Sequence, residues 1–378
     1  MHKEKKKVLF IFGTRPEAIK MAPIIIKAKK TKEFLPIVCV TGQHREMLNQ
    51  VLDFFQITPD YNLELMSANQ DLYSVTIKGL ERIKSVIDET EPDIILVQGD
   101  TTTSFIGSLA GYYSKIKVGH VEAGLRSGDK FSPYPEEIFR TLNGHIADIH
   151  FAPTKTTIEN LAKENIIKDV FLTGNTVIDS LFLGLDIIKS KGEETYYDKF
   201  QFIDFTKKII LITCHRRENF GTPLDEICRA VKDIAESYKD KVHFVYPVHL
   251  NPNVQNTVQE KLGNISNISL IAPLSYNHII WLMSKTYLII TDSGGIQEEA
   301  PSLAKPVLVI RDVTERVEAI EAGTAKLVGT KYKHIVRETQ KLIEDKDYYN
   351  LMSKANNPYG DGRASEYIID ILRKKLKL

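Results

Sequence analysis

Short apolar runs rich in β-branched residues alternate with amphipathic stretches along the first half of the chain. The runs lie at 8–12, 37–40, 93–98, 117–121, 149–152 and 170–172, and helical candidates lie between them at 16–30, 103–113 and 156–163. Continuously apolar strands separated by helices are typical of a parallel sheet covered on both faces. The first half therefore predicts a doubly wound α/β sheet.

The same alternation starts again after a polar stretch at 189–207, which we interpret as a linker or a domain boundary. Strands are expected at 209–213, 242–246, 268–271, 287–291 and 306–310, and helices at 223–237, 279–284, 296–303, 333–344 and 362–375. The 378 residues also exceed what one hydrophobic core usually supports. We predict an α/β fold of two Rossmann-like domains, residues 1–174 and 175–360, which face a central cleft.

Composition and charge exclude several classes of partner. Basic and acidic side chains number 50 and 49, and the formal net charge is +1, so we expect no binding to nucleic acid or to a membrane surface. The apolar run at the N-terminus ends at Gly13, and no stretch approaches the ~20 apolar residues of a membrane span. The three cysteines show no metal-ligand spacing, which indicates a reducing, cytoplasmic location and no metal site. Without a dinucleotide fingerprint or a P-loop, we expect no bound cofactor.

Acidic and basic residues gather after successive strands of the first half. Arg15 and Lys20 follow Gly13 near a helix N-terminus, where free backbone N–H groups favour an anion, although an ordinary strand-to-helix turn has the same pattern. Asp100, Glu122 and Glu136 follow at or beyond later strand ends, although Asp100 is also a plausible helix cap. Crowded, partly desolvated carboxylates divide into proton donors and acceptors. The three acids together therefore favour acid–base chemistry.

Phosphate-binding features dominate the second half. His215 follows a strand beside two arginines and is either structural or able to protonate a leaving phosphate. The turn formed by Ser293, Gly294 and Gly295 opens a helix, so its backbone N–H groups are candidates to bind a diphosphate. Further along, Glu299 is a candidate ligand of ribose hydroxyls. Arg311 and Arg316 are further candidates for the phosphate.

These segments together resemble the non-hydrolysing UDP-N-acetylglucosamine 2-epimerase family, which has the glycosyltransferase-B fold. The matching blocks are GTRPEAIKMAP, TGQHREML, QGDTTT, HVEAGLRSGDKFSPYPEE, HRREN, YPVHLNP, TDSGGIQEEAPSLAKPVLV and NPYGDGRA. The resemblance implies reversible interconversion of UDP-GlcNAc and UDP-ManNAc, by elimination of UDP to a 2-acetamidoglucal and re-addition, which supplies ManNAc for cell-surface polysaccharide. It also implies a homodimer and a C-terminal helix, 361–378, that crosses back onto the first domain.

The resemblance also assigns roles to residues. Asp100, Glu122, Glu136 and His215 match catalytic positions, and the substrate-binding positions are Arg15, Lys20, Arg140, Ser293, Gly294, Gly295, Glu299 and Arg316. A second nucleotide-sugar site that activates some members would use Gln43, Gln70, Arg216 and His249, although Asn69 stands where some of them have arginine. Ile279 and Val317 also depart from the usual phenylalanine and proline, which changes the shape expected of the uridine pocket. A hydrolysing relative, a glycosyltransferase on the same fold and a non-catalytic nucleotide-sugar sensor are the alternatives.

Overall fold

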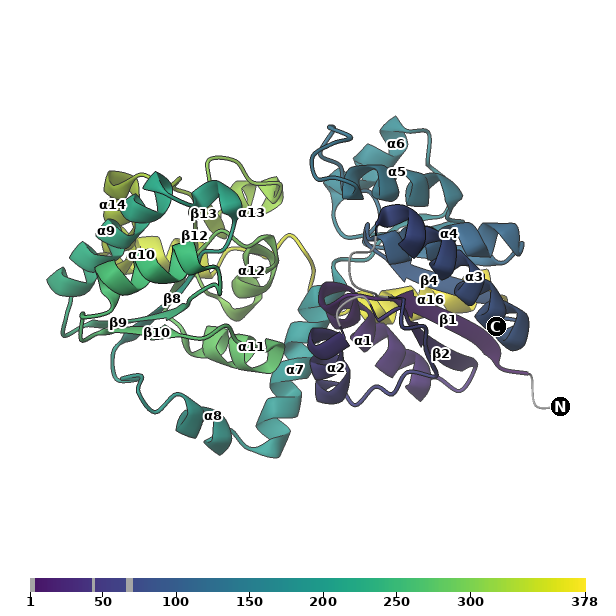
Figure 1. Ribbon diagram of the computed structural model, residues 1–378, viewed down its shortest axis with the longest axis horizontal. Helices are drawn as coiled ribbons and strands as arrows, with labels where there is room; N and C mark the ends of the chain where they lie inside the picture. Colours follow the sequence, from purple (N-terminus) through teal and green to yellow (C-terminus); the bar gives the residue numbers. More distant parts are fainter. Residues whose placement is uncertain (1–3, 43–44, 66–70) are drawn as a thin grey trace. The chain divides into compact units, whose positions relative to one another are not determined.

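The structure is a computed structural model that describes residues 4–42, 45–65 and 71–378 (Figure 1). Its contacts divide the chain into an N-terminal unit, residues 1–183 with 359–378, and a C-terminal unit, residues 184–358. The chain passes from one unit to the other inside helix α7 (Thr176–Lys191) and again at Pro358–Tyr359. The domain limits at 174 and 360 stay predictions.

Within the described residues, the N-terminal unit is built on a parallel seven-stranded sheet with the order β3-β2-β1-β4-β5-β6-β7. The strands are β1 (Lys6–Phe12), β2 (Phe34–Val40), β3 (Tyr61–Asn62), β4 (Ile94–Gln98), β5 (Lys117–Val121), β6 (Ile149–Ala152) and β7 (Val170–Leu172). The helices are α1 (Arg15–Lys30), α2 (Arg45–Phe54), α3 (Leu72–Thr90), α4 (Thr102–Tyr113), α5 (Glu136–Ile146), α6 (Lys155–Lys163) and α16 (Ala364–Lys375), together with the first part of α7.

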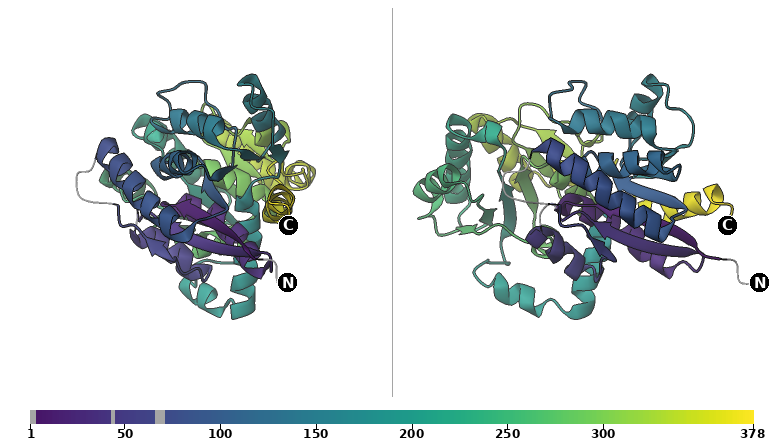
Figure 2. Two further views of the ribbon diagram at one scale, coloured as in Figure 1. Left: turned by 90° about the vertical axis from the view of Figure 1, so that its right-hand side faces the viewer. Right: turned by 45° about the vertical axis from the view of Figure 1, so that its right-hand side comes forward.

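Helices cover both faces of this sheet. Leu9 and Ile11 of β1 pack in one core cluster with Ile83 of α3 and Ile106 of α4. Because successive side chains of a strand point to opposite faces, the neighbouring residues of β1 face the other side, where α1 and α16 contact each other (Figure 1). Figure 2 shows α3 and α4 side by side in blue. The core of this unit is therefore a three-layer α/β/α arrangement.

Within the described residues, the C-terminal unit repeats the design with a parallel six-stranded sheet, in the order β10-β9-β8-β11-β12-β13. The strands are β8 (Lys208–Thr213), β9 (Val242–Pro247), β10 (Ile268–Ile271), β11 (Leu288–Thr291), β12 (Val307–Val309) and β13 (Ala325–Leu327). The helices are α8 (Glu194–Lys199), α9 (Thr222–Ser237), α10 (Pro252–Leu262), α11 (Tyr276–Lys285), α12 (Gly294–Glu299), α13 (Val317–Glu321), α14 (Tyr332–Glu344) and α15 (Lys346–Ser353), with 3₁₀ turns η1 (Arg217–Asn219) and η2 (Ala300–Leu303).

The polar stretch 189–207, the candidate for a linker or a domain boundary, is a folded part of the C-terminal unit, which begins at Gly184. The ring of Trp281 on α11 stacks on Phe200, with 5.3 Å between the ring centroids, and on Tyr196 of α8. The indole Nε1–H of Trp281 also donates to Glu193 at 3.0 Å. The charges of this stretch hid a few buried aromatic contacts, which are enough to fix a short helix.

Both sheets reverse their strand order at an equivalent place. In the N-terminal unit the order changes direction between β1 and β4, and in the C-terminal unit it changes between β8 and β11. Open α/β sheets bind ligands beyond the carboxyl ends of the strands at such a switch point. Of the candidate residues selected from the sequence, Arg15 and Asp100 follow β1 and β4, His215 and Ser293 follow β8 and β11, and Glu122 follows β5. Among the described residues, no helix is both long and apolar enough to cross a bilayer.

Candidate active site

A buried carboxylate organises the turn between β1 and α1. Glu17 accepts hydrogen bonds from the backbone N–H groups of Gly13, at 3.0 Å, and Thr14, at 2.7 Å. The Thr101 hydroxyl, on the loop after β4, donates to the other oxygen of Glu17 at 2.7 Å. This one side chain therefore joins the turn that carries Arg15 to the loop that carries Asp100.

The loop after β4 is held by neutral groups that the sequence analysis did not select. Gly99 has a φ of +69°, and its carbonyl accepts hydrogen bonds from His120 Nε2 at 2.7 Å and Asn143 Nδ2 at 3.3 Å. Burial lowers the pKa of His120 to about 3, so its ring is neutral at ordinary pH. The cap of α4 is Thr101, whose hydroxyl accepts from the N–H of Ser104, and the interpretation of Asp100 as that cap was wrong.

Glu122 lies just beyond β5 in a buried ion pair. Both of its oxygens contact Lys20 Nζ, at 2.6 and 2.7 Å, and Asn175 Nδ2 donates to Oε1 at 2.9 Å. Gln98 at the end of β4 donates to Oε2. Glu122 also has a φ of +64°, a backbone conformation that costs free energy in a residue with a Cβ and is often found at functional sites. The surrounding donors hold this carboxylate in one place.

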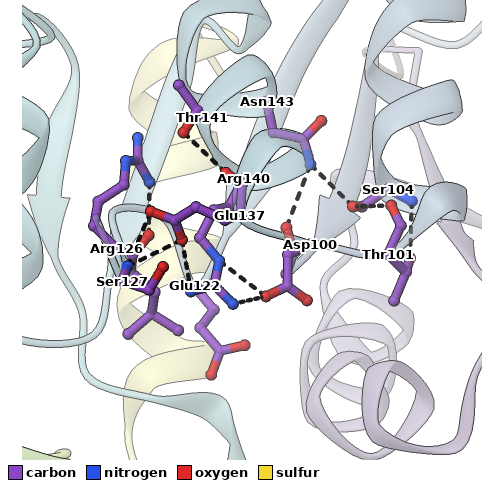
Figure 3. Close-up of polar contacts among 12 residues, drawn as sticks. Asp100, Thr101, Ser104, Glu122, Arg126, Ser127, Glu137, Arg140, Thr141 and Asn143 are labelled. Atoms are coloured by element: carbon purple, nitrogen blue, oxygen red, sulfur yellow. Dashed lines mark hydrogen bonds and ion pairs between the residues drawn. The ribbon is translucent and has the colours of Figure 1, made fainter. Parts of the chain in front are cut away.

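Asp100 belongs to a second ion-pair chain in the same unit. Arg140 Nε donates to Asp100 at 3.0 Å, and the Nη1 of the same guanidinium donates to Glu137 at 3.2 Å (Figure 3). Glu137 in turn accepts from the backbone N–H groups of Ser127 and Gly128. Asp100 and Glu122 are thus each paired with a cation, where the sequence suggested acids crowded against one another.

The third acid selected from the sequence lies outside these contacts. Glu136 is the first residue of α5 and is partly exposed, and its side chain makes no hydrogen bond or ion pair with any residue that the structure describes. Its neighbour Glu137 is 5% exposed and is the acid of this helix start that pairs with Arg140. Two consecutive acids at a helix start carry no sequence signal that tells the buried one from the exposed one. The catalytic role of Glu136 stays a prediction.

In the C-terminal unit, Asp292 at the end of β11 is fully buried and organises the segment after β8. Its Oδ2 accepts from the backbone N–H groups of His215 and Arg216 and from Asn219 Nδ2, each at 2.9 Å. The Nδ1 of His215 lies 3.1 Å from Oδ1, and almost half of the His215 side chain is exposed. The histidine selected from the sequence is therefore paired with a buried carboxylate, that of Asp292, which no sequence pattern indicated.

The glycine-rich turn follows directly after Asp292. Ser293 is the N-cap residue of α12, and Gly294 and Gly295 are its first two residues. A Cβ on Gly294 would lie 3.6 Å from the guanidinium carbon of Arg316, so that cation lies against the turn. Arg316 Nε is held by Glu298 at 2.5 Å. The structure thus brings together the turn and the arginine selected from the sequence.

Glu299 is buried and accepts a hydrogen bond from the Tyr276 hydroxyl at 3.0 Å.

Among the residues proposed for an activating site, Gln43 and Gln70 lie outside the described residues. Arg216 donates from Nε to the carbonyl of Asp292 at 2.9 Å, and His249 is exposed after β9, where its Nδ1 accepts from Asn251.

The strand orders and the polar groups at both switch points define an α/β protein of two Rossmann-like units. The sequence model of the family described as UDP-N-acetylglucosamine 2-epimerase matches residues 26–373. The UDP-N-acetylglucosamine 2-epimerase of Campylobacter jejuni is 55% identical over 377 residues, which cover 98% of this chain and 98% of that protein. The enzyme of the same name from Escherichia coli (strain K12) is 53% identical over 370 residues, 97% of this chain and 98% of that protein.

A solved structure agrees with these relatives. The crystal structure of UDP-GlcNAc 2-epimerase from Neisseria meningitidis, bound to UDP-GlcNAc, has a TM-score of 0.89 at 48% identity and covers 97% of this chain and 100% of that chain. This chain belongs to the UDP-N-acetylglucosamine 2-epimerase family. The predicted family, the predicted glycosyltransferase-B type of α/β fold and the predicted enzyme class, an isomerase, are confirmed.

Proposed function

We propose that this chain interconverts UDP-GlcNAc and UDP-ManNAc by inverting C2 of the sugar. UDP leaves as the C2 proton is removed, a 2-acetamidoglucal forms, and UDP adds back with protonation on the opposite face. The observation that carries the proposal is the pair of cation-held carboxylates, Glu122 with Lys20 and Asp100 with Arg140, on adjacent loops of one unit. An acid and a base with fixed positions are what removal and return of a proton require.

Each unit contributes a different part of this chemistry. The N-terminal unit supplies Asp100, Glu122 and Glu136 as candidates for the acid and the base, with Arg15, Lys20 and Arg140 as cations that favour an anionic substrate. The C-terminal unit supplies the UDP-binding groups. Ser293, Gly294, Gly295 and Arg316 bind the diphosphate, Glu299 accepts from the ribose, and His215 protonates the departing phosphate oxygen. The relative from Neisseria meningitidis, bound to UDP-GlcNAc, supports this substrate class.

Proton exchange at C2 tests the proposal directly. Incubation of the enzyme with UDP-GlcNAc in D2O should place deuterium at C2 of both nucleotide sugars, measured by NMR. Glu122→Gln should abolish the exchange, whereas Glu159→Gln, a change at an exposed acid of α6, should leave it intact. Stoichiometric release of free UDP would favour a hydrolysing enzyme instead. Tight binding of UDP-GlcNAc without exchange or turnover would indicate a sensor, and transfer to an added acceptor would indicate a glycosyltransferase.

The cellular setting is also part of the proposal. We infer a cytoplasmic enzyme that supplies ManNAc units for a surface polysaccharide and works as a homodimer. Tyr73 and Ile77, one turn apart on α3, are 79% and 58% exposed, and such apolar groups are candidates for a contact with a second copy. Light scattering on the wild-type protein and on a Tyr73→Glu, Ile77→Glu variant would test the dimer.

We also propose that UDP-GlcNAc activates the enzyme through a second site that includes Arg216 and His249. A sigmoidal dependence of the rate on substrate concentration would support this activation.

A further inference from the structure

The buried carboxylate of Asp292 has more hydrogen-bonding capacity than its structural role uses. All three donors that fix the segment after β8 meet one oxygen, Oδ2, each at 2.9 Å. Among the described residues, the other oxygen, Oδ1, has no hydrogen-bond partner of favourable geometry, although it is completely buried. The imidazole of His215 lies against it, with Nδ1 at 3.1 Å from Oδ1, and the buried thiol of Cys214 also contacts the Asp292 carboxylate.

A structural role alone does not account for a charged group at this position. Asparagine would present an amide oxygen of the same size to the backbone N–H groups of His215 and Arg216. It would also avoid the cost of burying a charge, which is several kcal/mol for an unpaired ion. Burial opposes the ionised form of Asp292, but the hydrogen bonds and charge of His215 and the backbone N–H of Arg216 outweigh it and lower the pKa of Asp292. The ionised carboxylate is thus retained beside the imidazole.

We propose that Asp292 is the positioning residue of His215: its Oδ1 accepts the Nδ1–H of the ring. The imidazolium then gives its Nε2 proton to the departing diphosphate, and the neutral Nδ1–H form that remains takes that proton back at Nε2 when UDP adds again. The proposal rests on the proposed function for the identity of that diphosphate. A neutral imidazole carries one proton, and the hydrogen bond made by one ring nitrogen decides which nitrogen holds it. A carboxylate fixes both the tautomer and the direction of the ring in this way in serine hydrolases.

Asp292 also lies directly before the turn that is proposed to bind the diphosphate. Ser293, Gly294 and Gly295 follow it directly, so the same residue anchors the histidine and the turn proposed to bind the diphosphate. The carbonyl of Asp292 also accepts from Arg216 Nε at 2.9 Å. His215 and the turn are therefore fixed relative to each other by one buried residue, and a proton donor fixed in this way needs no rearrangement when UDP departs.

Histidine NMR on the full-length enzyme tests the tautomer without any assay of the reaction. The ring nitrogens of ¹⁵N-histidine-labelled protein distinguish Nδ1–H from Nε2–H, and the signal of His215 is identified by its loss in His215→Gln. We expect His215 in the wild-type enzyme to carry its proton on Nδ1 in the neutral form. In Asp292→Asn, the side-chain amide donates in place of the carboxylate, and we expect the Nε2–H form. An Nε2–H tautomer in the wild-type enzyme overturns the proposal even if the variant fails to fold.

Kinetics and a matched variant separate positioning from general damage. Asp292→Asn should lower kcat by at least about 100-fold, since the same change costs about 10⁴-fold in a serine protease, and should leave the Kd of UDP within about 3-fold. Asn219→Ala removes a donor from Oδ2 and leaves Oδ1 intact, so it should keep the Nδ1–H tautomer. An unchanged tautomer in Asp292→Asn would contradict the inference. If Asp292→Asn changes the tautomer but the wild-type protein shows no proton exchange at C2, the positioning role of Asp292 would be supported and the proposed function contradicted.

Discussion

The Nζ of Lys20 lies 2.6 and 2.7 Å from the two carboxylate oxygens of Glu122, and this contact joins residues 102 positions apart in the chain. Their side chains are 17% and 5% exposed. At this depth the ion pair is poorly screened by water, so each partner depends on the other for its charge. The pair therefore has measurable consequences for both stability and chemistry.

Lys20→Met should destabilise the protein, because it leaves the charge of Glu122 buried without its lysine, beside the neutral donors Gln98 and Asn175. Removing one partner of a buried ion pair typically costs about 3–5 kcal/mol, and these donors place the expected loss near the lower value. Urea unfolding followed by circular dichroism at pH 7.5 measures it. Combining the change with Glu122→Gln should recover most of the loss. A double variant that is less stable than Lys20→Met would show that the pair does not act as a unit.

Glu17 should matter for catalysis without touching substrate. Glu17→Ala removes the acceptor shared by Gly13, Thr14 and Thr101, so the turn with Arg15 and the loop with Asp100 lose their common anchor. We expect kcat to fall at least about 10-fold, since small displacements of positioned groups are costly.

The matched change Glu17→Gln gives the control for this prediction. Its amide oxygen still accepts from both backbone N–H groups, and its NH₂ can donate to Thr101. Burial raises the pKa of Glu17 despite these hydrogen bonds, so the loss of its charge removes a desolvation cost. We expect activity within about 3-fold of wild type. Equal losses in Glu17→Ala and Glu17→Gln would mean that the charge, and not the hydrogen bonding, is what catalysis needs.

Part of the fold was predictable because its physical signal is local. The strand Lys117–Val121 and the final helix follow from apolar periodicity within one segment, and the alternation of such segments predicted parallel sheets. The two-residue strand Tyr61–Asn62 and the edge strand Ala325–Leu327 were missed. They are too short for a periodic signal, and pairing with a neighbour, not composition, makes them strands.

In the candidate site, too, residues with a local sequence signal were predicted, and residues whose role depends on tertiary contacts were not. Residues next to strand ends, such as Asp100, Glu122 and His215, were selected because position along a parallel strand fixes which edge of the sheet a residue reaches. The groups that hold them, such as Glu137 and Asp292, were not selected. Whether an acid accepts backbone N–H groups from a distant loop depends on tertiary packing, and sequence spacing does not reveal it.

His120 should make the protein sensitive to mild acid. Its folded-state pKa of about 3 lies below the ordinary value of 6.5, so the unfolded chain binds the proton more readily. Stability is therefore complete above about pH 6.5 and falls as the pH drops from there toward 3, by up to about 1.4 kcal/mol per pH unit. His150, whose pKa burial lowers to about 4, acts in the same direction.

The change His120→Gln tests this contribution. Its amide keeps a donor near the carbonyl of Gly99 but cannot take up a proton. Between pH 6.5 and 5, the wild-type free energy of unfolding should fall by about 1.6 kcal/mol more than that of His120→Gln. Urea unfolding at the two pH values measures the difference. Fluorescence of Trp281, the single tryptophan, reports on the C-terminal unit and shows whether that unit responds separately. Parallel pH dependences in the two proteins would contradict the assignment.

Gly13 should not tolerate a side chain, and the reason is a specific hydrogen bond. The hydroxyls of Thr41 and Thr103 lie 2.8 Å apart, and a Cβ on Gly13 would come within 1.9 Å of the first and 2.7 Å of the second. Gly13→Ala must therefore break this buried hydrogen bond or shift the backbone of β1. We expect a loss of about 2–3 kcal/mol, within the usual range for overpacking, measured by urea unfolding.

Because the closest obstacle is one hydroxyl, a second substitution should relieve the strain. Thr41→Ala alone should cost about 1 kcal/mol, since it leaves Thr103 without its partner. In the double variant, the added methyl of Gly13→Ala occupies space that the Thr41 hydroxyl has vacated, so the combined loss should be smaller than the sum of the single losses. Additive losses would mean that the clash of the added Cβ is with Thr103 or the backbone, and not with Thr41. The glycine would then be required by the path of the chain into α1, and not by the hydroxyl pair beneath it.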